Sequence, residues 1–493
     1  MKKTDKFKPK SKGALLLGVL VMGAAGILVL GGLVSWGVSN LKLTRQTVNR
    51  EMALQIAEAG VEYYRWHLSE APDDFTDGTG EAGPYEHNFF DRTGNLIGKY
   101  YLEIEPSTTT GIIIVRSRGE TLTVPLVSRT IEVKLVKPSL VKYAFLANSL
   151  IRFGQGTEVF GPIHSNNGVR LDGLAHNLVT SALEQYQDPD HEEGEEFAVH
   201  THINPPPPPD NYVSSFRPDE APPSLVASRP DIFMAGRQFP VPAIDFAGLT
   251  SSLIELKTLA EGNGRYFSPS GAFGYNIILK TDDSFDLYKV DSLLPPPQKK
   301  CAKVNWDGQE GWGTWSVGTQ TFLGNYPFPE NGIIFTEDHV WVEGAIDGAH
   351  LSIAAGRFPE NPDTNANINF DRDIVYTNRD GSDSIGLIAQ GNVNVGMASN
   401  DILRVDAALI AKNGRVGRYF YTTNCAPWNV RESIYLYGMV VTNSRYGFAY
   451  ADNDEGGYAN RYLEYDKNLV LNPPPFFPLI GDIYEIASWK ETE

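Results

Sequence analysis

Residues 14–38 read A-L-L-L-G-V-L-V-M-G-A-A-G-I-L-V-L-G-G-L-V-S-W-G-V, an uncharged apolar run of 25 residues. About 20 apolar residues in a helix, at about 1.5 Å each, suffice to cross a bilayer core of about 30 Å. No other run in the sequence is as long and apolar. The sequence therefore predicts one membrane-spanning helix with a large body attached. A cleavable secretory signal is the alternative, although its apolar core is usually shorter.

The residues before this run are basic. Six lysines and one aspartate precede it, so the leader at residues 1–13 carries a net charge of +5. Because basic flanks resist translocation, we expect the leader in the cytoplasm and the body outside the membrane, in the envelope or at the cell surface. The whole chain carries −18, which leaves −23 for the rest. This acidic body disfavours nucleic-acid binding, which needs a basic face.

The helix is predicted to continue beyond the membrane, because no proline occurs between residue 14 and Pro72. Apolar residues recur there at spacings of three, four or seven, which is typical of one helix face. These residues are Leu41, Val48, Met52, Ile56, Ala59, Tyr63 and Trp66. We therefore predict a transmembrane and stalk helix over residues 14–69.

This N-terminal segment resembles that of PilX-type minor pilins and related type IV pilus-assembly proteins. The matching pieces are the leader ending K-S-K-G-A-L-L-L, the apolar helix, and Q-I-A-E-A-G-V-E-Y-Y at residues 55–64. The resemblance implies a bacterial membrane protein whose stalk motif contains Glu58, Ala59, Gly60 and Glu62. As partners it implies the lipid bilayer, other pilins or pilus-assembly proteins contacting residues 14–69, and a prepilin peptidase.

By the same resemblance, the peptidase would cut between Gly13 and Ala14. The fifth residue of a mature pilin is glutamate, whereas the corresponding residue here is Gly18. A permanently anchored, pilin-like surface protein is therefore the alternative to a processed filament component. The departure favours a minor or accessory role over that of a major filament subunit.

Residues 70–141 are predicted to form a small antiparallel β meander. Three segments, starting at Lys99, Gly111 and Ser128, are rich in β-branched and aromatic residues and lie between turn formers. Residues 142–174 and 331–480 instead contain many short strands separated by Gly, Asn and Asp. This texture favours a β-helix or solenoid-like head, with a β-sandwich as the alternative. The predicted fold class is thus mainly β with one long N-terminal α-helix.

Residues 175–330 are predicted to be an insertion in this head. They contain an acidic stretch at 188–196, five prolines at 205–209, one helix and one hairpin. For the helix, Asp245 is the expected N-cap and Gly262 the stop. Its expected buried face is Leu249, Leu253, Leu256 and Ala260. The hairpin covers Tyr275 to Val290 and turns at residues 281–284.

Two further motifs extend the family resemblance beyond the N-terminal segment. Residues 465–478 read Y-D-K-N-L-V-L-N-P-P-P-F-F-P, and residues 161–166 read G-P-I-H-S-N. Both are similar to motifs of large pilus-assembly-associated bacterial surface proteins. The prolines predict an extended strap that Phe476 and Phe477 pin to the body, and His164 is expected to stabilise a corner between strands.

Candidate chemistry is limited to acidic residues, histidines and two cysteines. Neighbouring carboxylates on a β-helix are typical of carbohydrate-active enzymes, and the candidate pairs are Asp371 with Asp373, Asp401 with Asp406, and Asp452 with Asp454. Asp371, Asp373, Asp452 and Asp454 are also candidate calcium ligands, with solvated turns as the ordinary interpretation. His191, His200 and His202 lie near the acidic stretch and are candidate transition-metal ligands, although an H-x-H pair in a loop is a weak signal.

Cys301 and Cys425 either form one disulfide, as an exported protein permits, or remain two buried thiols. The stalk motif is more specific than the carboxylates, so we expect a non-catalytic pilus-assembly or adhesion component. No resident cofactor is expected apart from the candidate calcium. A membrane-anchored carbohydrate-active enzyme is the alternative.

Overall fold

The structure, a computed structural model of the 493-residue chain, describes residues 12–107, 111–122, 127–191, 194–205, 211–298, 300–301, 313–450 and 456–492. It divides into two compact units. The smaller contains the chain up to Pro106, the segment Ile113–Leu135 and the C-terminal end from Ser488. The larger, called the head below, contains Ser107–Ile112 and Val136–Ala487.

The smaller unit is a five-stranded sheet with one long helix. The strand order is β1-β2-β3-β4-β32, and β1 to β4 pair with their neighbours in antiparallel fashion. The elements are α1 (Lys12–Glu70), β1 (Tyr85–Phe90), β2 (Leu96–Pro106), β3 (Ile113–Thr121), β4 (Ser128–Val136) and β32 (Glu485–Thr492). The three predicted strands are confirmed as β2, β3 and β4. The edge strands β1 and β32 were not predicted.

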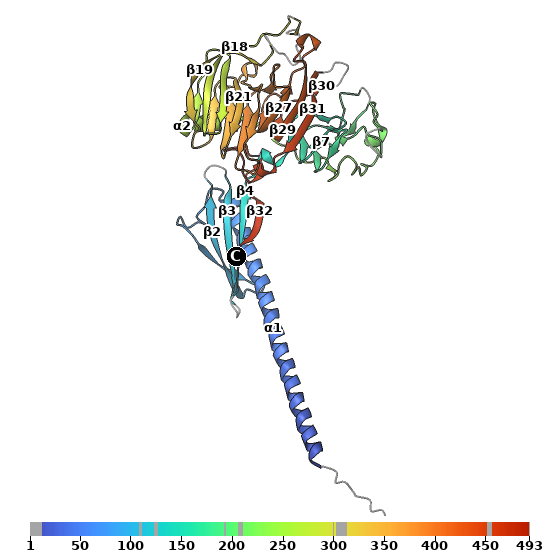
Figure 1. Cartoon of the computed structure of the whole chain (residues 1–493), viewed down its shortest axis with the longest axis vertical. Helices are drawn as coiled ribbons and strands as arrows, with labels where there is room; N and C mark the ends of the chain where they lie inside the picture. Colours follow the sequence, from blue (N-terminus) through green and yellow to red (C-terminus); the bar gives the residue numbers. More distant parts are fainter. Residues whose placement is uncertain are drawn as a thin grey trace, which may run out of the picture. The chain divides into compact units, whose positions relative to one another are not determined.

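The C-terminal part of α1 lies against this sheet, and its N-terminal part continues beyond the sheet (Figure 1). Small residues allow the close contact. A Cβ atom added to Gly119 of β3 would lie 2.2 Å from the carbonyl oxygen of Ala53 and 2.5 Å from the amide nitrogen of Ala57. A Cβ atom added to Gly60 of α1 would lie 2.4 Å from the hydroxyl of Ser117. Glycine at both positions therefore lets the helix backbone approach the strand.

The face of α1 that packs on the sheet differs from the apolar face that the residue spacing indicated. Of the residues predicted for that face, Ile56 is buried, whereas Leu41, Val48 and Trp66 are more than half exposed. The residues that do pack on the sheet are Ala53, Ile56, Ala57, Gly60, Val61, Tyr64 and Leu68. The two sets share only Ile56, because the packed face also depends on where the helix meets the glycines of the sheet. The predicted helix over residues 14–69 is itself confirmed, since α1 spans Lys12–Glu70.

The head consists mainly of parallel strands that stack coil upon coil. One array has the order β16-β20-β22-β25-β27-β29-β5-β8-β11-β15. Its strands are β16 (Arg265–Phe267), β20 (Ile333–Thr336), β22 (His350–Ala355), β25 (Ser384–Ala389), β27 (Ile402–Ala411), β29 (Val430–Thr442), β5 (Phe145–Ala147), β8 (Ile163–Ser165), β11 (Val179–Ser181) and β15 (Arg237–Gln238). Parallel pairing excludes the β-sandwich alternative, whose sheets are antiparallel.

Two further sides of the coils are built in the same way. Strands β17, β21, β23, β26 and β28 form one series, and β21, β24, β27, β29 and β31 form the other. The new strands are β17 (Gly274–Lys280), β21 (Val340–Ile346), β23 (Ile368–Phe370), β24 (Ile374–Tyr376), β26 (Val393–Val395), β28 (Val416–Arg418) and β31 (Gly456–Tyr465). Each strand buries its inward side chains on the next coil, which gives one continuous apolar core. The predicted fold class is confirmed, since the protein is mainly β with one long N-terminal helix, a small antiparallel sheet and a large parallel-sheet head.

The order of the coils differs from the order of the chain. The head begins in the middle of the stack, where β5 pairs with β29, although the paired residues Phe145 and Val440 are 295 positions apart in sequence. After β5 the chain forms β8, β11 and β15, which stack in that order on one side of β5. Later in the chain, β20, β22, β25, β27 and β29 stack in sequence order, and β29 ends beside β5. On another side of the coils that contain β5, β8 and β11, three short strands pair in parallel. They are β6 (Ile151–Phe153), β9 (Val169–Leu171) and β14 (Val199–His200). Thus β11 and β14, which lie in the predicted insertion, belong to the stack.

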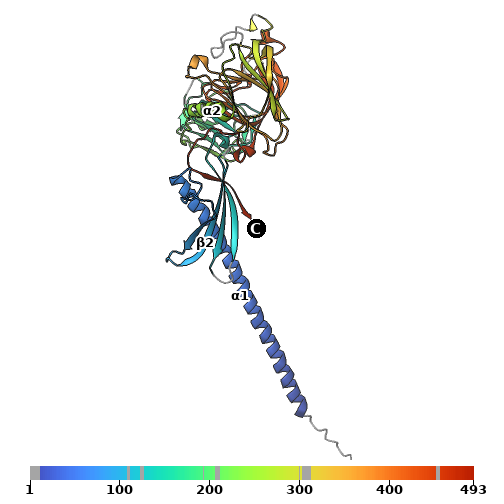
Figure 2. The ribbon, with the colours of Figure 1, turned by 90° about the vertical axis from the view of Figure 1, so that its left-hand side faces the viewer.

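Helix α2 (Leu249–Asn263) lies on the outer side of the first array (Figure 2). Its predicted face is confirmed, because Leu249, Leu253, Leu256 and Ala260 are at most 4% exposed. Its ends were predicted less well, since the N-cap is Gly248 rather than Asp245 and the C-cap is Gly264 rather than Gly262. The predicted hairpin is confirmed: β17 pairs with β18 (Ser284–Leu293), and β18 pairs in turn with β19 (Val317–Pro327).

The N-P-P-P-F-F segment covers the same array beside α2. The carbonyl oxygen of Pro475 accepts a hydrogen bond of 2.5 Å from Ser352 of β22. The ring of Phe477 is buried and lies over Gly386 of β25. Phe476 is partly buried at the edge of the same cluster. The predicted strap is therefore present and is held by the Pro475 carbonyl and the buried ring of Phe477, whereas Phe476 is only partly buried.

Cys301 and Cys425 form a disulfide with a Cα–Cα distance of 4.9 Å. The bond links two segments 124 residues apart and lies beside Met397, Tyr419 and Tyr421. Of the two interpretations left open by the sequence, the structure has the disulfide.

Candidate functional site: the uncovered half of the long helix

The N-terminal half of α1 is apolar and has no protein cover within the described chain. Leu15, Met22 and Leu28 are each 76–77% exposed, and the most apolar 18-residue window of the helix has none of its residues buried. By length and composition this helix is able to cross a membrane. Large exposed apolar surfaces mark contact with lipid or with another protein.

The exposed apolar half measures about 36 Å from Leu15 to Val38 at 1.5 Å per residue, enough for a bilayer core of about 30 Å. The first charged side chain after it is Lys42. Two hydroxyls close to this boundary are bonded to the helix itself, Thr44 to the carbonyl of Asn40 at 2.9 Å and Thr47 to that of Leu43 at 3.0 Å. Their donors are therefore satisfied without water.

Helix α1 continues without a break from the exposed apolar run to the part that packs on the sheet. Packing against the sheet begins near Ala53, about four turns after Val38, the last residue of the exposed apolar run. Polar and charged side chains occupy the interval, among them Lys42, Arg45 and Arg50. A single rigid rod thus joins an apolar surface to a folded unit.

The stalk motif lies on the part of α1 that packs on the sheet. Gly60 faces Ser117, Tyr100 and Leu102, so it is a packing residue. Glu58 and Glu62 point away from the sheet and are exposed. Glu62 pairs with Arg65 at 2.6 Å, one turn along the helix. The conspicuous glycine of the motif therefore has a structural role, and its carboxylates remain available to solvent.

The proposed processing site lies at the start of α1, whose backbone is helical through Gly13 and Ala14. Gly18 lies in the helix about one turn later. A Cβ atom added there would meet no atom within 4 Å. The fold therefore has room for the glutamate found at this position in pilins, so sterics within this chain do not explain its absence.

The candidate calcium ligands are held by protein donors. Asp371 accepts hydrogen bonds from the Ser316 hydroxyl at 2.9 Å and the Val317 amide at 3.3 Å, and burial raises its pKa to about 7. Both oxygens of this carboxyl group are therefore engaged by donors of the protein itself. Asp373 accepts instead from Asn400 and the Arg404 amide. Asp452 and Asp454 lie outside the described residues.

The G-P-I-H-S-N motif builds a corner of the coil stack. His164 is buried, its Nδ1 lies 2.9 Å from the Thr180 hydroxyl, and burial lowers its pKa, which favours the neutral ring. Asn166 donates to Asn148 at 2.8 Å, which in turn donates to Asn443 at 2.9 Å. Such asparagine ladders bond the turns of one coil to those of the next, so this motif stabilises the stack.

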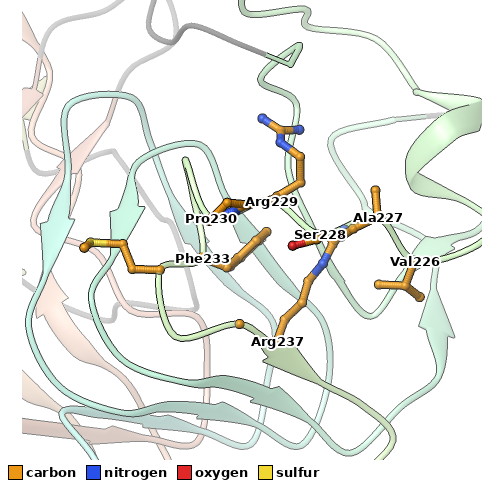
Figure 3. A pocket seen from close by; sticks show the side chains of 9 residues that line it. Val226, Ala227, Ser228, Arg229, Pro230, Phe233 and Arg237 are labelled. Carbon is orange, nitrogen blue, oxygen red and sulfur yellow. The ribbon is translucent and has the colours of Figure 1, made fainter.

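A shallow pocket of about 290 Å³ lies between residues 226 and 237, with Arg229 and Arg237 on its wall (Figure 3). Both guanidinium groups are already paired. Arg237 bonds Glu220 at 2.7 Å, and Arg229 bonds Asp231 at 2.8 Å and the carbonyl of Ile203 at 2.8 Å. Because both guanidinium groups already form ion pairs within the protein, neither offers an unpaired positive charge to an anionic ligand in this pocket.

The small residues that seat α1 on the sheet were not among the predicted site residues. Ala53, Ala57 and Gly60 recur at spacings of four and three, which places them on one helix face. Small residues at this spacing, together with glycines in strands such as Gly98 and Gly119, indicate a helix that packs closely on a sheet.

No protein-family model matches the chain, and no curated protein matches it. Among solved structures, the crystal structure of the competence-associated pilin ComZ from Thermus thermophilus is similar to this chain with a TM-score of 0.32 and 13% sequence identity. The similarity covers 90% of this chain and 97% of that one. A TM-score this low assigns neither a fold nor a function, so the function has to be argued from the residues themselves.

Proposed function

We propose that this chain is a pilin-like, membrane-anchored surface protein that serves as a minor or accessory component in type IV pilus or pseudopilus assembly or in adhesion, without catalysis. The observation that carries the proposal is the continuity of α1. Its first half exposes a mostly apolar and uncharged surface from Leu15 to Val38, and its second half is seated on an antiparallel sheet through glycine contacts. One helix that both anchors and supports a folded unit suits a pilin-like architecture.

The flanks of the helix give the proposed orientation. The leader has a net charge of +5 and the rest of the chain −23. Because lysines resist translocation, the leader stays in the cytoplasm and both folded units lie outside. The apolar half of α1 is then covered by lipid when the protein is in the membrane, and by the corresponding helices of other pilins when it is part of an assembly.

Gly18 supports an accessory role. A glutamate at the fifth mature position is the family's pattern, and this chain lacks that carboxylate although the helix has room for it. The proposed partner surface is therefore the apolar helix itself, without a charged contact at its N-terminal end.

No observation favours the carbohydrate-active alternative among the described residues. Asp401 accepts a hydrogen bond from the Glu432 amide at 3.1 Å, and Asp406 pairs with Arg379 at 2.8 Å. Each carboxylate is thus bonded to donors of its own coil or a neighbouring one. Paired carboxylates for glycoside hydrolysis must instead face a substrate together, about 5–10 Å apart.

The state of the N-terminus tests the proposed processing. We expect the protein in the membrane fraction of its host, with a mature N-terminus at Ala14. A Gly13→Leu variant is the matched control, because a side chain at the cut site blocks a glycine-specific peptidase while leaving the apolar run intact. Recovery of the wild-type protein with the lysine leader intact would show that it is a permanently anchored protein, and recovery in the soluble fraction would contradict the anchor itself.

A further inference from the structure

Three histidines and two acidic residues converge in the interior of the head, at the β14 end of the stack. Asp188 follows β12 (Gln185–Tyr186), and Glu196 lies in β13 (Glu196–Phe197), which pairs with β12 in an antiparallel hairpin. His200 lies in β14 opposite Arg170 of β9. The side chains of Asp188, Glu196 and His200 are at most 2% exposed, and that of His191 is 6% exposed. The cluster is therefore almost fully removed from water.

Each histidine of the cluster uses one ring nitrogen to donate to a backbone carbonyl oxygen. The three contacts are His191 Nε2 to Ser214 at 2.8 Å, His200 Nδ1 to Phe197 at 3.1 Å, and His202 Nδ1 to Val213 at 3.1 Å. A carbonyl oxygen only accepts, so each of these nitrogens carries its hydrogen. In a neutral ring the other nitrogen carries no hydrogen, so its lone pair can accept a hydrogen bond or bind a metal ion. Metal-binding histidines almost always have their second nitrogen held in this way.

The free nitrogens point at the two carboxylates. His200 Nε2 lies 2.9 Å from Glu196 Oε2 and 3.6 Å from Asp188 Oδ2. His191 Nδ1 lies 3.5 Å and 3.6 Å from the same two oxygens. Despite these short distances, His191 Nδ1, His200 Nε2 and Glu196 Oε2 have no hydrogen-bond partner among the residues that the structure describes. The four atoms therefore converge on a common point, at separations of 2.9–3.6 Å that a shared proton or a bound cation can bridge.

The spacing of these four atoms matches a coordination shell. Zinc bonds to histidine nitrogen and carboxylate oxygen are about 2.0–2.2 Å, so ligand atoms at the corners of a tetrahedron lie about 3.3–3.6 Å apart. The four measured edges run from 2.9 to 3.6 Å. One ligand atom from each of Asp188, His191, Glu196 and His202 also lies within 4.8 Å of the others.

We propose that the head binds one divalent transition-metal ion, Zn²⁺ in the first instance, through Asp188 Oδ2, His191 Nδ1, Glu196 Oε2 and His200 Nε2. His200 is assigned as the fourth ligand because its Nε2 is unpartnered, whereas His202 Nε2 bonds Glu196 Oε1 at 3.1 Å. His202 is thus a positioning residue for Glu196. Two imidazoles and two carboxylates form a donor set suited to zinc.

The charges around the cluster also fit a divalent cation. Two carboxylates balance the two positive charges of the ion, and Arg170 is balanced by Asp172 at 2.8 Å. Arg170 Nη1 also lies 3.3 Å from Asp188 Oδ2 and orients that carboxylate from outside. Without the ion, neutral histidines would direct lone pairs at two buried carboxylates, which is unfavourable unless the rings take up protons.

The proposed site is structural. All four ligands come from the protein and the site is buried, which is typical of a closed zinc site without a position for substrate. The ligands join the β12–β13 hairpin to β14, so the ion would fix the loop at the β14 end of the stack. This role is independent of the anchoring function proposed for α1.

The test is the metal content of the full chain, purified in detergent without a polyhistidine tag. We expect about one zinc per chain by mass spectrometry, and a fall of at least about 5 °C in the unfolding temperature of the head after chelation, restored by Zn²⁺ alone. The variants His191→Ala and His200→Ala should each lose the metal, and Glu196→Gln should lose it while keeping the shape of the side chain. His176→Ala, on a neighbouring coil, is the matched control and should keep it.

Two results would overturn the proposal. One is wild-type protein that takes up no zinc and whose unfolding temperature is insensitive to chelation, which would mean that protonated histidines pair with the carboxylates instead. The other is metal retained by both His191→Ala and His200→Ala. Loss of metal in His202→Ala but not in His200→Ala would overturn the assignment of the fourth ligand. Because wild-type protein alone decides the first result, the test does not depend on the folding of any variant.

Discussion

Gly119→Val should release α1 from its sheet. A Cβ atom at this position would lie 2.2 Å and 2.5 Å from backbone atoms of Ala53 and Ala57, and backbone atoms of a helix cannot move aside individually. We expect a loss of about 3 kcal/mol in the stability of the smaller unit, at the upper end of overpacking effects. Valine favours β structure more than glycine does, so strand propensity alone predicts the opposite sign.

Hydrogen–deuterium exchange of the full chain measures this effect. Peptides from β2 and β3 should lose protection in Gly119→Val, while peptides from β25 in the head should not change. Arg118→Val is the matched control, because it places the same side chain one residue earlier, on the exposed face of the strand. Equal protection in the Gly119 and Arg118 variants would show that the glycine contact does not hold the helix in place.

Phe477→Ala should loosen the C-terminal strap and the array beneath it. The ring is 6% exposed and lies over Gly386, in a cluster that also contains residues of α2. Truncation of a buried phenylalanine costs about 3–5 kcal/mol. We therefore expect a lower urea midpoint for the head and faster exchange in β22 and β25.

Leu479→Ala is the control for the strap, because this side chain is 51% exposed only two residues away. A surface truncation of this kind changes stability by about 0.5 kcal/mol or less. If Phe477→Ala were as mild as Leu479→Ala, the strap would be a passive covering, and the three prolines before it would need another explanation.

Local sequence patterns predicted the local structure well. The face of α2 was predicted by apolar residues at helical spacing, and the hairpin of β17 and β18 by turn residues between two apolar runs. The three middle strands of the small sheet followed from β-branched clusters. In each case the signal and its structural consequence lie within about 20 residues of each other.

Long-range arrangements could not be predicted in the same way. Nothing near Phe145 indicates that it pairs with Val440, because that pairing depends on how the whole stack is ordered. The seat of α1 depends on Gly119, which is 59 residues from Gly60 in sequence. The histidine cluster was only a group of candidates until the fold placed Asp188 and Glu196 around it.

The stalk motif illustrates how a resemblance gains a physical meaning. Its glycine seats the helix on the sheet, which ties the motif to packing rather than to chemistry. Its carboxylates are exposed, and Glu62 pairs with Arg65 on the same helix. In this chain the motif therefore fixes the packing of the helix, and this role requires no ligand.

Crosslinking from the apolar helix in the native host shows whether α1 contacts other pilin-type subunits. A photoreactive amino acid at Leu33, which is 56% exposed in the middle of the apolar run, should crosslink to the apolar helix of another pilin-type subunit. The same group at Arg118, on the outer face of β3, should give no such product. We expect crosslinks from Leu33 to pilin-type subunits, whereas a protein that crosslinks there only to lipid would contradict a role in pilus assembly.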